Sequence, residues 1–120
     1  MASFGDLQQL FRNPPQKYTN CPYWICNGDM RHEEIEFQLG HLSKHGIKAV
    51  MMSPIFGVWT RFPERPWFEA VQAACRKAAE LDMEIIVWDE YNWPTGSAGG
   101  KLPEMRPDLA KKSARIIDRV

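Results

Sequence analysis

Residues 84–100 read EIIVWDEYNWPTGSAGG, an apolar run that passes directly into a polar, aromatic and glycine-rich segment. The run 84–88 is short and almost entirely apolar, which is typical of a strand buried in a parallel sheet. The segment 89–100 is rich in turn-forming residues and lacks a helical or strand period, which predicts a loop. A loop at the carboxyl end of a buried strand is where α/β proteins commonly bind ligands.

Two further apolar runs lie upstream. Residues 23–26 (YWIC) form a short extended run that ends at the turn-forming group 27–29 (NGD). Residues 47–52 (IKAVMM) form a second run, which leads into an aromatic and aperiodic segment, 55–65. Both runs are predicted to be strands with a ligand-facing loop after them.

Helical spacing of apolar residues separates these strands. A helix is predicted over 30–44, ended by Gly46 as a C′ glycine, and another is predicted to begin at Pro66. A last helix is expected over 107–120. The residues expected to face inward are Ile35, Leu39 and Leu42 in the first helix, Phe68, Val71, Ala74, Cys75, Ala78 and Leu81 in the second, and Leu109, Ile116, Ile117 and Val120 in the last.

The order β-α-β-α-β-loop-α predicts an α/β fold with a parallel sheet and right-handed crossovers. Residues 1–22 are expected to form an N-terminal arm, and 23–120 about three β/α units of a TIM (β/α)₈ barrel. A whole barrel usually needs ~250 residues, whereas this chain has 120. We therefore expect a partial barrel, completed by self-association or by the remainder of a barrel.

The charge and composition of the chain argue against some classes of binding partner. Fifteen basic and fifteen acidic side chains balance to a net charge of zero, which argues against nucleic acid and anionic membranes as partners. The apolar runs are far shorter than the ~20 residues of a membrane span. The opening residues lack the pattern of a secretion signal, so the chain is expected to be cytoplasmic or a mature secreted segment.

The cysteines and histidines do not predict a metal site. Cys21, Cys26 and Cys75 form neither an even disulfide set nor a CxxC pair, so they are expected to be reduced. His41 and His45 are spaced HxxxH without the glutamate of HExxH, which favours a solvated helix face.

Seven residues near strand ends are the candidates for binding a sugar. Aromatic faces stack on the C–H surface of a pyranose, while carboxylates and amides hydrogen-bond to its hydroxyl groups. The candidates are Asp89, Glu90, Asn92 and Trp93 after the third strand, Asn27 and Trp24 at the first, and Trp59 after the second. The loop after the second strand also offers Ser53, Phe56, Thr60 and Arg61 to the same rim.

Structural roles for these residues stay open at this point. Asp89 alternatively caps the following turn, Glu90 makes a salt bridge, and Trp93 and Pro94 form a packed corner. Neighbours on a strand point to opposite faces, so only one of the two carboxylates is expected to enter a pocket. Glycosidases place two carboxyl groups roughly 5–9.5 Å apart across the scissile bond, and this adjacent pair does not match that arrangement. The catalytic residues are therefore not identified.

The phrase WDEYNWPTGSAGG, with the preceding PWFEAVQAACRKAAELDMEIIV, resembles a segment of glycoside hydrolases of the α-L-rhamnosidase type (family 106-like). The resemblance extends upstream to YWICNG at residues 23–28 and to Trp67-Phe68. It covers roughly residues 23–100, and Asp89-Glu90, Trp93-Pro94 and Gly99-Gly100 are its strongest points.

The resemblance implies the N-terminal part of a barrel that hydrolyses glycosidic bonds of poly- or oligosaccharides. It places the catalytic carboxylates on later strands, carries Asp89 and Glu90 over only as residues that contact substrate, and implies calcium assistance in some relatives. The alternative is a noncatalytic carbohydrate-binding or self-associating α/β fragment. A nucleotide-binding domain is disfavoured because the turn at 27–29 holds only one glycine.

Overall fold

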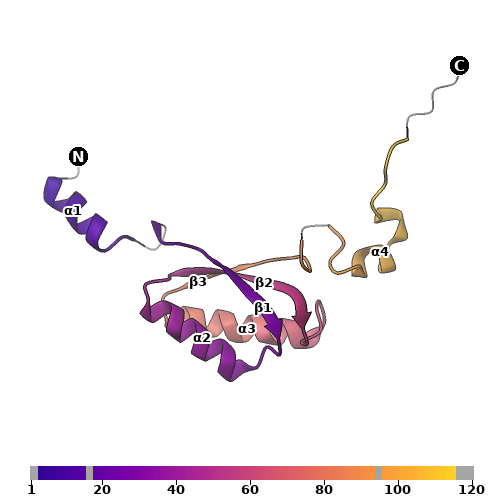
Figure 1. Cartoon of the computed structure of the whole chain (residues 1–120), viewed down its shortest axis with the longest axis horizontal. Helices are drawn as coiled ribbons and strands as arrows, with labels where there is room; N and C mark the ends of the chain where they lie inside the picture. Colours follow the sequence, from indigo (N-terminus) through magenta and orange to yellow (C-terminus); the bar gives the residue numbers. More distant parts are fainter. Residues whose placement is uncertain (1–2, 16–17, 94–95, 116–120) are drawn as a thin grey trace, which may run out of the picture.

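The computed structural model of the chain describes residues 3–15, 18–93 and 96–115. Three strands, β1 (Tyr23–Gly28), β2 (Ala49–Val58) and β3 (Glu84–Val87), form a parallel sheet in the order β1-β2-β3 (Figure 1). The predicted α/β fold with a three-stranded parallel sheet is confirmed.

The central strand β2 is longer than the sequence predicts, because it continues through Pro54 to Val58. Proline lacks the N–H that a central strand donates to its neighbour. Pro54 is aligned with Cys26, and the register between the strands shifts between Cys26 and Gly28. The irregular pairing accommodates the proline, and the two strands end opposite each other at Gly28 and Val58.

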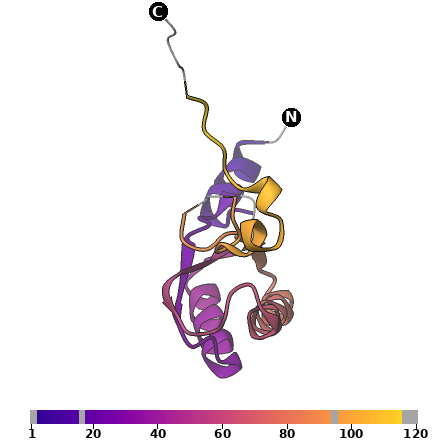
Figure 2. The same ribbon diagram turned by 90° about the vertical axis from the view of Figure 1, so that its right-hand side faces the viewer.

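Two helices connect the strands, as expected. Helix α2 (His32–Lys44) is followed by Gly46 at φ +82°, the left-handed conformation that a C′ glycine adopts readily. Helix α3 (Arg65–Glu80) has Pro66 in its first turn, where no N–H is required. Both helices cover the same face of the sheet, as Figures 1 and 2 show.

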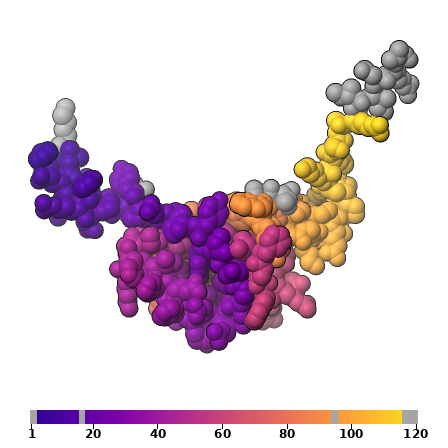
Figure 3. All heavy atoms as spheres, viewed as in Figure 1, coloured from indigo at the N-terminus to yellow at the C-terminus, as the bar shows by residue number. Residues whose placement is uncertain are grey.

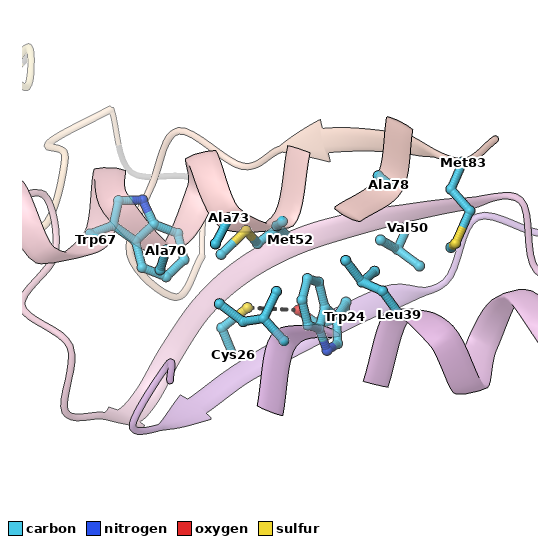
Figure 4. Packing of buried hydrophobic residues seen from close by; sticks show 12 residues of the cluster. Trp24, Cys26, Leu39, Val50, Met52, Trp67, Ala70, Ala73, Ala78 and Met83 are labelled. Atoms are coloured by element: carbon cyan, nitrogen blue, oxygen red, sulfur yellow. Dashed lines mark hydrogen bonds between the residues drawn. The ribbon is translucent and has the colours of Figure 1, made fainter. Parts of the chain in front are cut away.

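The core lies between that face and the two helices (Figure 4). Trp24 and Cys26 of β1 and Val50 and Met52 of β2 are buried there. They meet Ile35 and Leu39 of α2 and Trp67, Ala70, Ala74 and Ala78 of α3. The alanines let α3 approach the sheet closely, while the single tryptophan fills the space at its amino end.

The inward face predicted for α3 is wrong in part. Trp67 is buried, whereas its neighbour Phe68 is 54% exposed and Cys75 is exposed. Successive helical residues are separated by about 100°, so the choice of Trp67 as the anchor turns Phe68 and Cys75 toward solvent. Cys75 is therefore not the core residue that the sequence suggests.

Both ends of the chain also differ from expectation. The N-terminal arm contains a helix, α1 (Phe4–Arg12), whose first turn is closed by a capping box between Ser3 and Asp6. Figure 3 shows this helix projecting from the body of the molecule. Because the main-chain N–H of Ser3 donates to the Asp6 carboxylate at 2.7 Å, the pKa of the Asp6 carboxyl is lowered.

The helix predicted over 107–120 is wrong for the part that the structure describes. A short helix, α4 (Lys101–Met105), comes earlier, and a single 3₁₀ turn, η2 (Pro107–Leu109), is followed by residues 111–115 without regular structure. Residues 116–120 lie outside the described residues. Leu109 is 52% exposed, so this segment gains none of the packing that stabilises a short helix.

In the described part of the chain no helix lies on the second face of the sheet, which we call the open face (Figures 1 and 2). Side chains alternate along a strand, so the residues between the core positions point to this side. In register, Tyr23, Met51 and Ile86 form a first row across the sheet, and Ile25, Ser53 and Trp88 form a second. Among the described residues, none of the helices is long and apolar enough to span a membrane.

Candidate functional site

A pocket of about 360 Å³ lies on the open face and extends to the carboxyl ends of the strands. Its lining residues come from β1, β2 and the segment after β3: Tyr23, Ile25, Ser53, Ile55, Phe56, Trp88, Asn92 and Trp93. Aromatic and aliphatic side chains dominate the wall, and Ser53, Asn92 and the Tyr23 hydroxyl bring polar groups. Such a surface suits a small neutral ligand with one apolar face.

The loop after β3 is organised around the carboxylate of Glu90, which is only 3% exposed. Its Oε1 accepts hydrogen bonds from the main-chain N–H groups of Tyr91 at 3.0 Å and Gly99 at 2.8 Å. Its Oε2 accepts one from Ser97 at 2.7 Å. These charge-assisted bonds compensate the buried carboxylate and hold the two ends of the loop together. Glu90 thus positions the loop.

Asn92 connects this loop to β2. Its side-chain Oδ1 accepts the N–H of Phe56 at 2.6 Å, and its own N–H donates to the Pro54 carbonyl at 2.9 Å. The residue lies at φ +62°, a left-handed conformation that asparagine tolerates better than most residues. These contacts place the Asn92 amide and the Phe56 ring on the same side of the pocket.

Four aromatic rings in contact, those of Phe56, Tyr91, Phe62 and Trp67, connect the loop after β3 to helix α3. Tyr91 lies 6.1 Å from Phe56 edge to face and 6.1 Å from Phe62 in a stacked arrangement. Phe62 meets the buried ring of Trp67 edge to face at 5.5 Å. Gly99 lies against these rings, since a Cβ there would come within 3.4 Å of Phe62 and Tyr91. The loop is thereby coupled to the helical core.

Trp88 forms the floor of the pocket beside β1. Its ring meets that of Tyr23 edge to face at 5.8 Å. Its indole N–H is buried without a hydrogen-bond partner among the described residues. A buried donor without an acceptor lowers the free energy of unfolding by about 1–3 kcal/mol, so the Trp88 N–H at the pocket wall is expected to destabilise the fold by this amount.

The structure brings together only part of the predicted set. Asn92 and Trp93 line the pocket with Phe56 and Ser53. Glu90 is buried within the loop and Asp89 is exposed, so only the first is enclosed. Pro94 lies outside the described residues.

The remaining predicted residues lie elsewhere. Trp24 is buried beneath the sheet, where its indole N–H donates to Gln38 Oε1 at 2.7 Å. Asn27 is exposed at the end of β1, and Trp59 is 78% exposed after β2. The Trp59 N–H donates to the Gly28 carbonyl at 2.6 Å, which keeps the ends of β1 and β2 together.

Sequence reasoning missed Tyr23, Ile25 and Trp88 as pocket residues. The alternation of the strand contained the signal, since a buried Trp24 and Cys26 turn Tyr23 and Ile25 to the opposite side. Trp24, predicted to line the rim at the carboxyl end of the first strand, is instead buried in the core on the helix-covered face.

Metal ligands do not converge in the part of the chain that the structure describes: no three His, Cys, Asp or Glu side chains form a group that could hold an ion. The expectation of calcium assistance stays a prediction. The exposed rings of His41, in α2, and His45, at its C-cap, are tilted to each other with centroids 4.5 Å apart. Among the thiols, burial raises the pKa of Cys26 to about 12, which makes it a poor nucleophile.

Comparison of the chain with protein-family models, with curated proteins and with solved structures finds no match.

Proposed function

We propose that this chain is part of a (β/α)₈-barrel glycoside hydrolase and supplies one wall of its sugar site. The observation that carries the proposal is the pocket at the carboxyl end of the sheet, which is lined by Phe56, Trp88 and Trp93 together with Asn92. Aromatic faces and a convergent amide are the groups that bind a pyranose. The sequence resemblance to α-L-rhamnosidase-type enzymes supports the same class of ligand.

Both helices lie on one face of the sheet, which supports a barrel as the fold of the whole protein. In a TIM barrel the helices lie outside, and inward side chains form layers contributed by alternate strands. The two rows on the open face, Tyr23-Met51-Ile86 and Ile25-Ser53-Trp88, have the apolar character expected of such layers. The pocket then opens at the carboxyl end of the strands, where barrel enzymes bind substrate.

The positions of the carboxylates indicate that this chain binds the sugar and that other parts of the barrel carry out the catalysis. None of the eight described residues that line the pocket carries a carboxylate. Glu90 is engaged with loop N–H groups and Asp89 is exposed. The chain therefore contributes binding and orientation, and the acid and the second carboxylate come from other strands of the barrel.

Ligand-observed NMR with a panel of methyl glycosides that includes rhamnosides tests this proposal. One wall of a sugar site is expected to bind with a Kd in the millimolar range, about −4 kcal/mol. Trp93→Ala is expected to weaken binding about tenfold because it removes the exposed stacking surface. Phe68→Ala, which removes an exposed ring on α3 away from the pocket (54% exposed, against 76% for Trp93), is the control and leaves binding unchanged.

Hydrolysis of aryl glycosides by the same samples separates binding from catalysis. We expect binding without turnover by the 120-residue chain. The absence of binding to every sugar tested, or equal loss of binding in the Trp93 and Phe68 variants, would overturn the proposal.

A further inference from the structure

Helix α1 has a strongly two-sided surface with no partner in the described part of the chain. Its four apolar side chains, Phe4, Leu7, Leu10 and Phe11, recur at helical spacing and share one face. All of its residues are exposed, and the Phe4 and Phe11 rings are 77% and 90% exposed. A helix of nine residues is marginal in water by itself, so α1 gains stability only if this face packs against another surface.

The open face of the sheet lacks a cover and matches α1 in character. Tyr23, Ile25 and Ile86 are 55%, 44% and 43% exposed on it. Neither of its two rows contains a charged side chain. The largest apolar patch of an ordinary monomer is about 300–600 Å² and often marks an interaction site, which makes this face a candidate interface.

The dimensions of the two surfaces also agree. At about 1.5 Å per residue, α1 is about 13 Å long, and it is about 10 Å in diameter. Neighbouring strands are about 4.8 Å apart, so three strands with their side chains present a face about 14 Å across. One α1 therefore spans the sheet from β1 to β3 over the first row.

The chain directs α1 away from its own sheet. The helix ends at Arg12 with Asn13 as its C-cap, and Pro14 and Pro15 follow at once. Two consecutive prolines fix φ and favour an extended chain directly after α1. In Figure 1 α1 stands clear of the sheet and of both core helices. Its apolar face is thus positioned to meet another molecule.

We propose that in the 120-residue chain α1 of one copy packs across the first row (Tyr23, Met51 and Ile86) on the open face of a second copy, in the place that other strands would take in a closed barrel, and that the exchange is reciprocal. A two-fold axis makes both contacts equivalent, as in domain-swapped dimers. The docking position lies at the amino-terminal half of the sheet. It shares Tyr23 with the pocket wall but leaves Asn92 and Trp93 at the carboxyl end free. The proposal does not rest on sugar binding.

The area suffices for such a dimer. At about 200 Å² for an aromatic side chain, the exposed parts of Phe4, Phe11 and Tyr23 amount to about 450 Å² in one contact. Two equivalent contacts double this to about 900 Å² before the leucines and isoleucines are added. The total approaches the ~1,600 Å² of a standard stable interface.

A membrane surface fits α1 less well than a second copy. Helices that bind membranes carry several lysines or arginines on the polar face, whereas α1 has only Arg12, next to Asp6, Gln8 and Gln9. Binding of the chain to anionic vesicles that depends on Leu7, in place of dimerisation, would overturn the proposal.

Light scattering coupled to size exclusion is the first test, using the full chain. We expect a dimer of the 13.9 kDa chain. Leu7→Glu places a charge at the centre of the apolar face of α1 and Ile86→Lys places one on the open face, so each is expected to give a monomer. Gln9→Glu, on the opposite side of α1, adds the same charge and stays dimeric. Circular dichroism shows whether each variant is folded.

Mixing the two monomeric variants distinguishes reciprocal exchange from every simpler arrangement. The intact α1 of the Ile86→Lys chain can dock on the intact sheet of the Leu7→Glu chain, so an equimolar mixture is expected to form a heterodimer with one of its two contacts. A mixture that stays monomeric, a wild-type chain that is monomeric at about 100 μM, or a Leu7→Glu variant that stays dimeric would each overturn the exchange.

Discussion

The Oε1 of Glu90 accepts the main-chain N–H of Gly99 at 2.8 Å, so the carboxylate closes a loop across nine residues of sequence. The same oxygen accepts the N–H of Tyr91, and Oε2 accepts that of Ser97. Three N–H donors converge on one buried carboxylate, which gives the loop after β3 a defined shape without a helix or strand. Asp89, the adjacent carboxylate, stays exposed.

Glu90→Gln is expected to lower the free energy of unfolding by about 1.5–3 kcal/mol. The amide keeps the shape of the side chain, but its NH₂ group faces at least one N–H donor and cannot accept its bond. Urea denaturation followed by tryptophan fluorescence measures the change. Asp89→Asn is the matched control and shifts the midpoint little. Equal effects of the two substitutions would contradict the assigned role of Glu90.

Asn92→Ala is expected to cost about 1–3 kcal/mol. The substitution removes the acceptor of the Phe56 N–H and leaves a non-glycine residue at φ +62°. Asn92→Gly relieves the backbone strain without restoring the acceptor, so its cost should lie between those of the wild type and the alanine variant. Denaturation midpoints measure this order. A glycine variant that is less stable than the alanine variant would exclude strain as a cause.

Trp67→Ala is expected to destabilise the fold by about 3–5 kcal/mol, because the ring is buried between α3 and the sheet and supports Phe62. Phe68→Ala, one residue further along α3, removes a ring that is 54% exposed. Its effect should be within about 0.5 kcal/mol. The ratio of the two effects, measured in urea, tests the rotation of α3 about its axis.

The three thiols are expected to differ in reactivity. Cys21 and Cys75 are exposed, while Cys26 is buried and its thiol contacts the Trp24 carbonyl at 3.3 Å. In native protein at pH 8, two thiols should react rapidly with an aromatic disulfide reagent and the third only after unfolding in urea. Rapid reaction of all three in native protein would show that the sheet does not protect Cys26.

The raised pKa of Cys26 also predicts a loss of stability in alkali. Burial raises this pKa from 9.0 to about 12, so the unfolded chain loses the thiol proton first as the pH rises. The contribution is fully present below pH 9.0 and falls by about 1.4 kcal/mol per pH unit up to about pH 12. Cys26→Ala removes this slope, and the difference between the two chains in urea denaturation at pH 8 to 11 measures it.

Local pattern was sufficient where one short segment decides its own structure. The three apolar strand runs, the stop at Gly46 and the start near Pro66 are visible in the sequence and present in the structure. The predicted burial of the third strand is wrong, because Ile86 and Val87 are 43% and 47% exposed on a sheet whose second face carries no helix in the described chain. The helix predicted from the apolar spacing after residue 107 is wrong. Leu109 is exposed and packs against no other part of the described chain, so nothing stabilises a helix there.

The candidate site was predicted only in part, and for a specific reason. Asn92 and Trp93 were recognisable as polar and aromatic residues after a strand, and both line the pocket. Tyr23 and Trp88 line the same pocket because β1 and β3 lie on either side of β2. Trp24 does not line it, because its side chain points to the opposite face of the sheet, which the helices cover. These contacts join residues that are far apart in the chain, so a pattern of neighbouring residues cannot predict them.

The sequence by itself therefore determined the three strands, the two helices between them and the edge of the sheet where the polar and aromatic loop residues lie, because those follow from short-range periodicity and turn chemistry. Tertiary structure decided which way α3 turns, which carboxylate is enclosed, and which face of the sheet stays open. These outcomes depend on which surfaces meet, since burial of one side chain such as Trp67 excludes its neighbour, and the charge of Glu90 is tolerated only where three N–H groups converge on it.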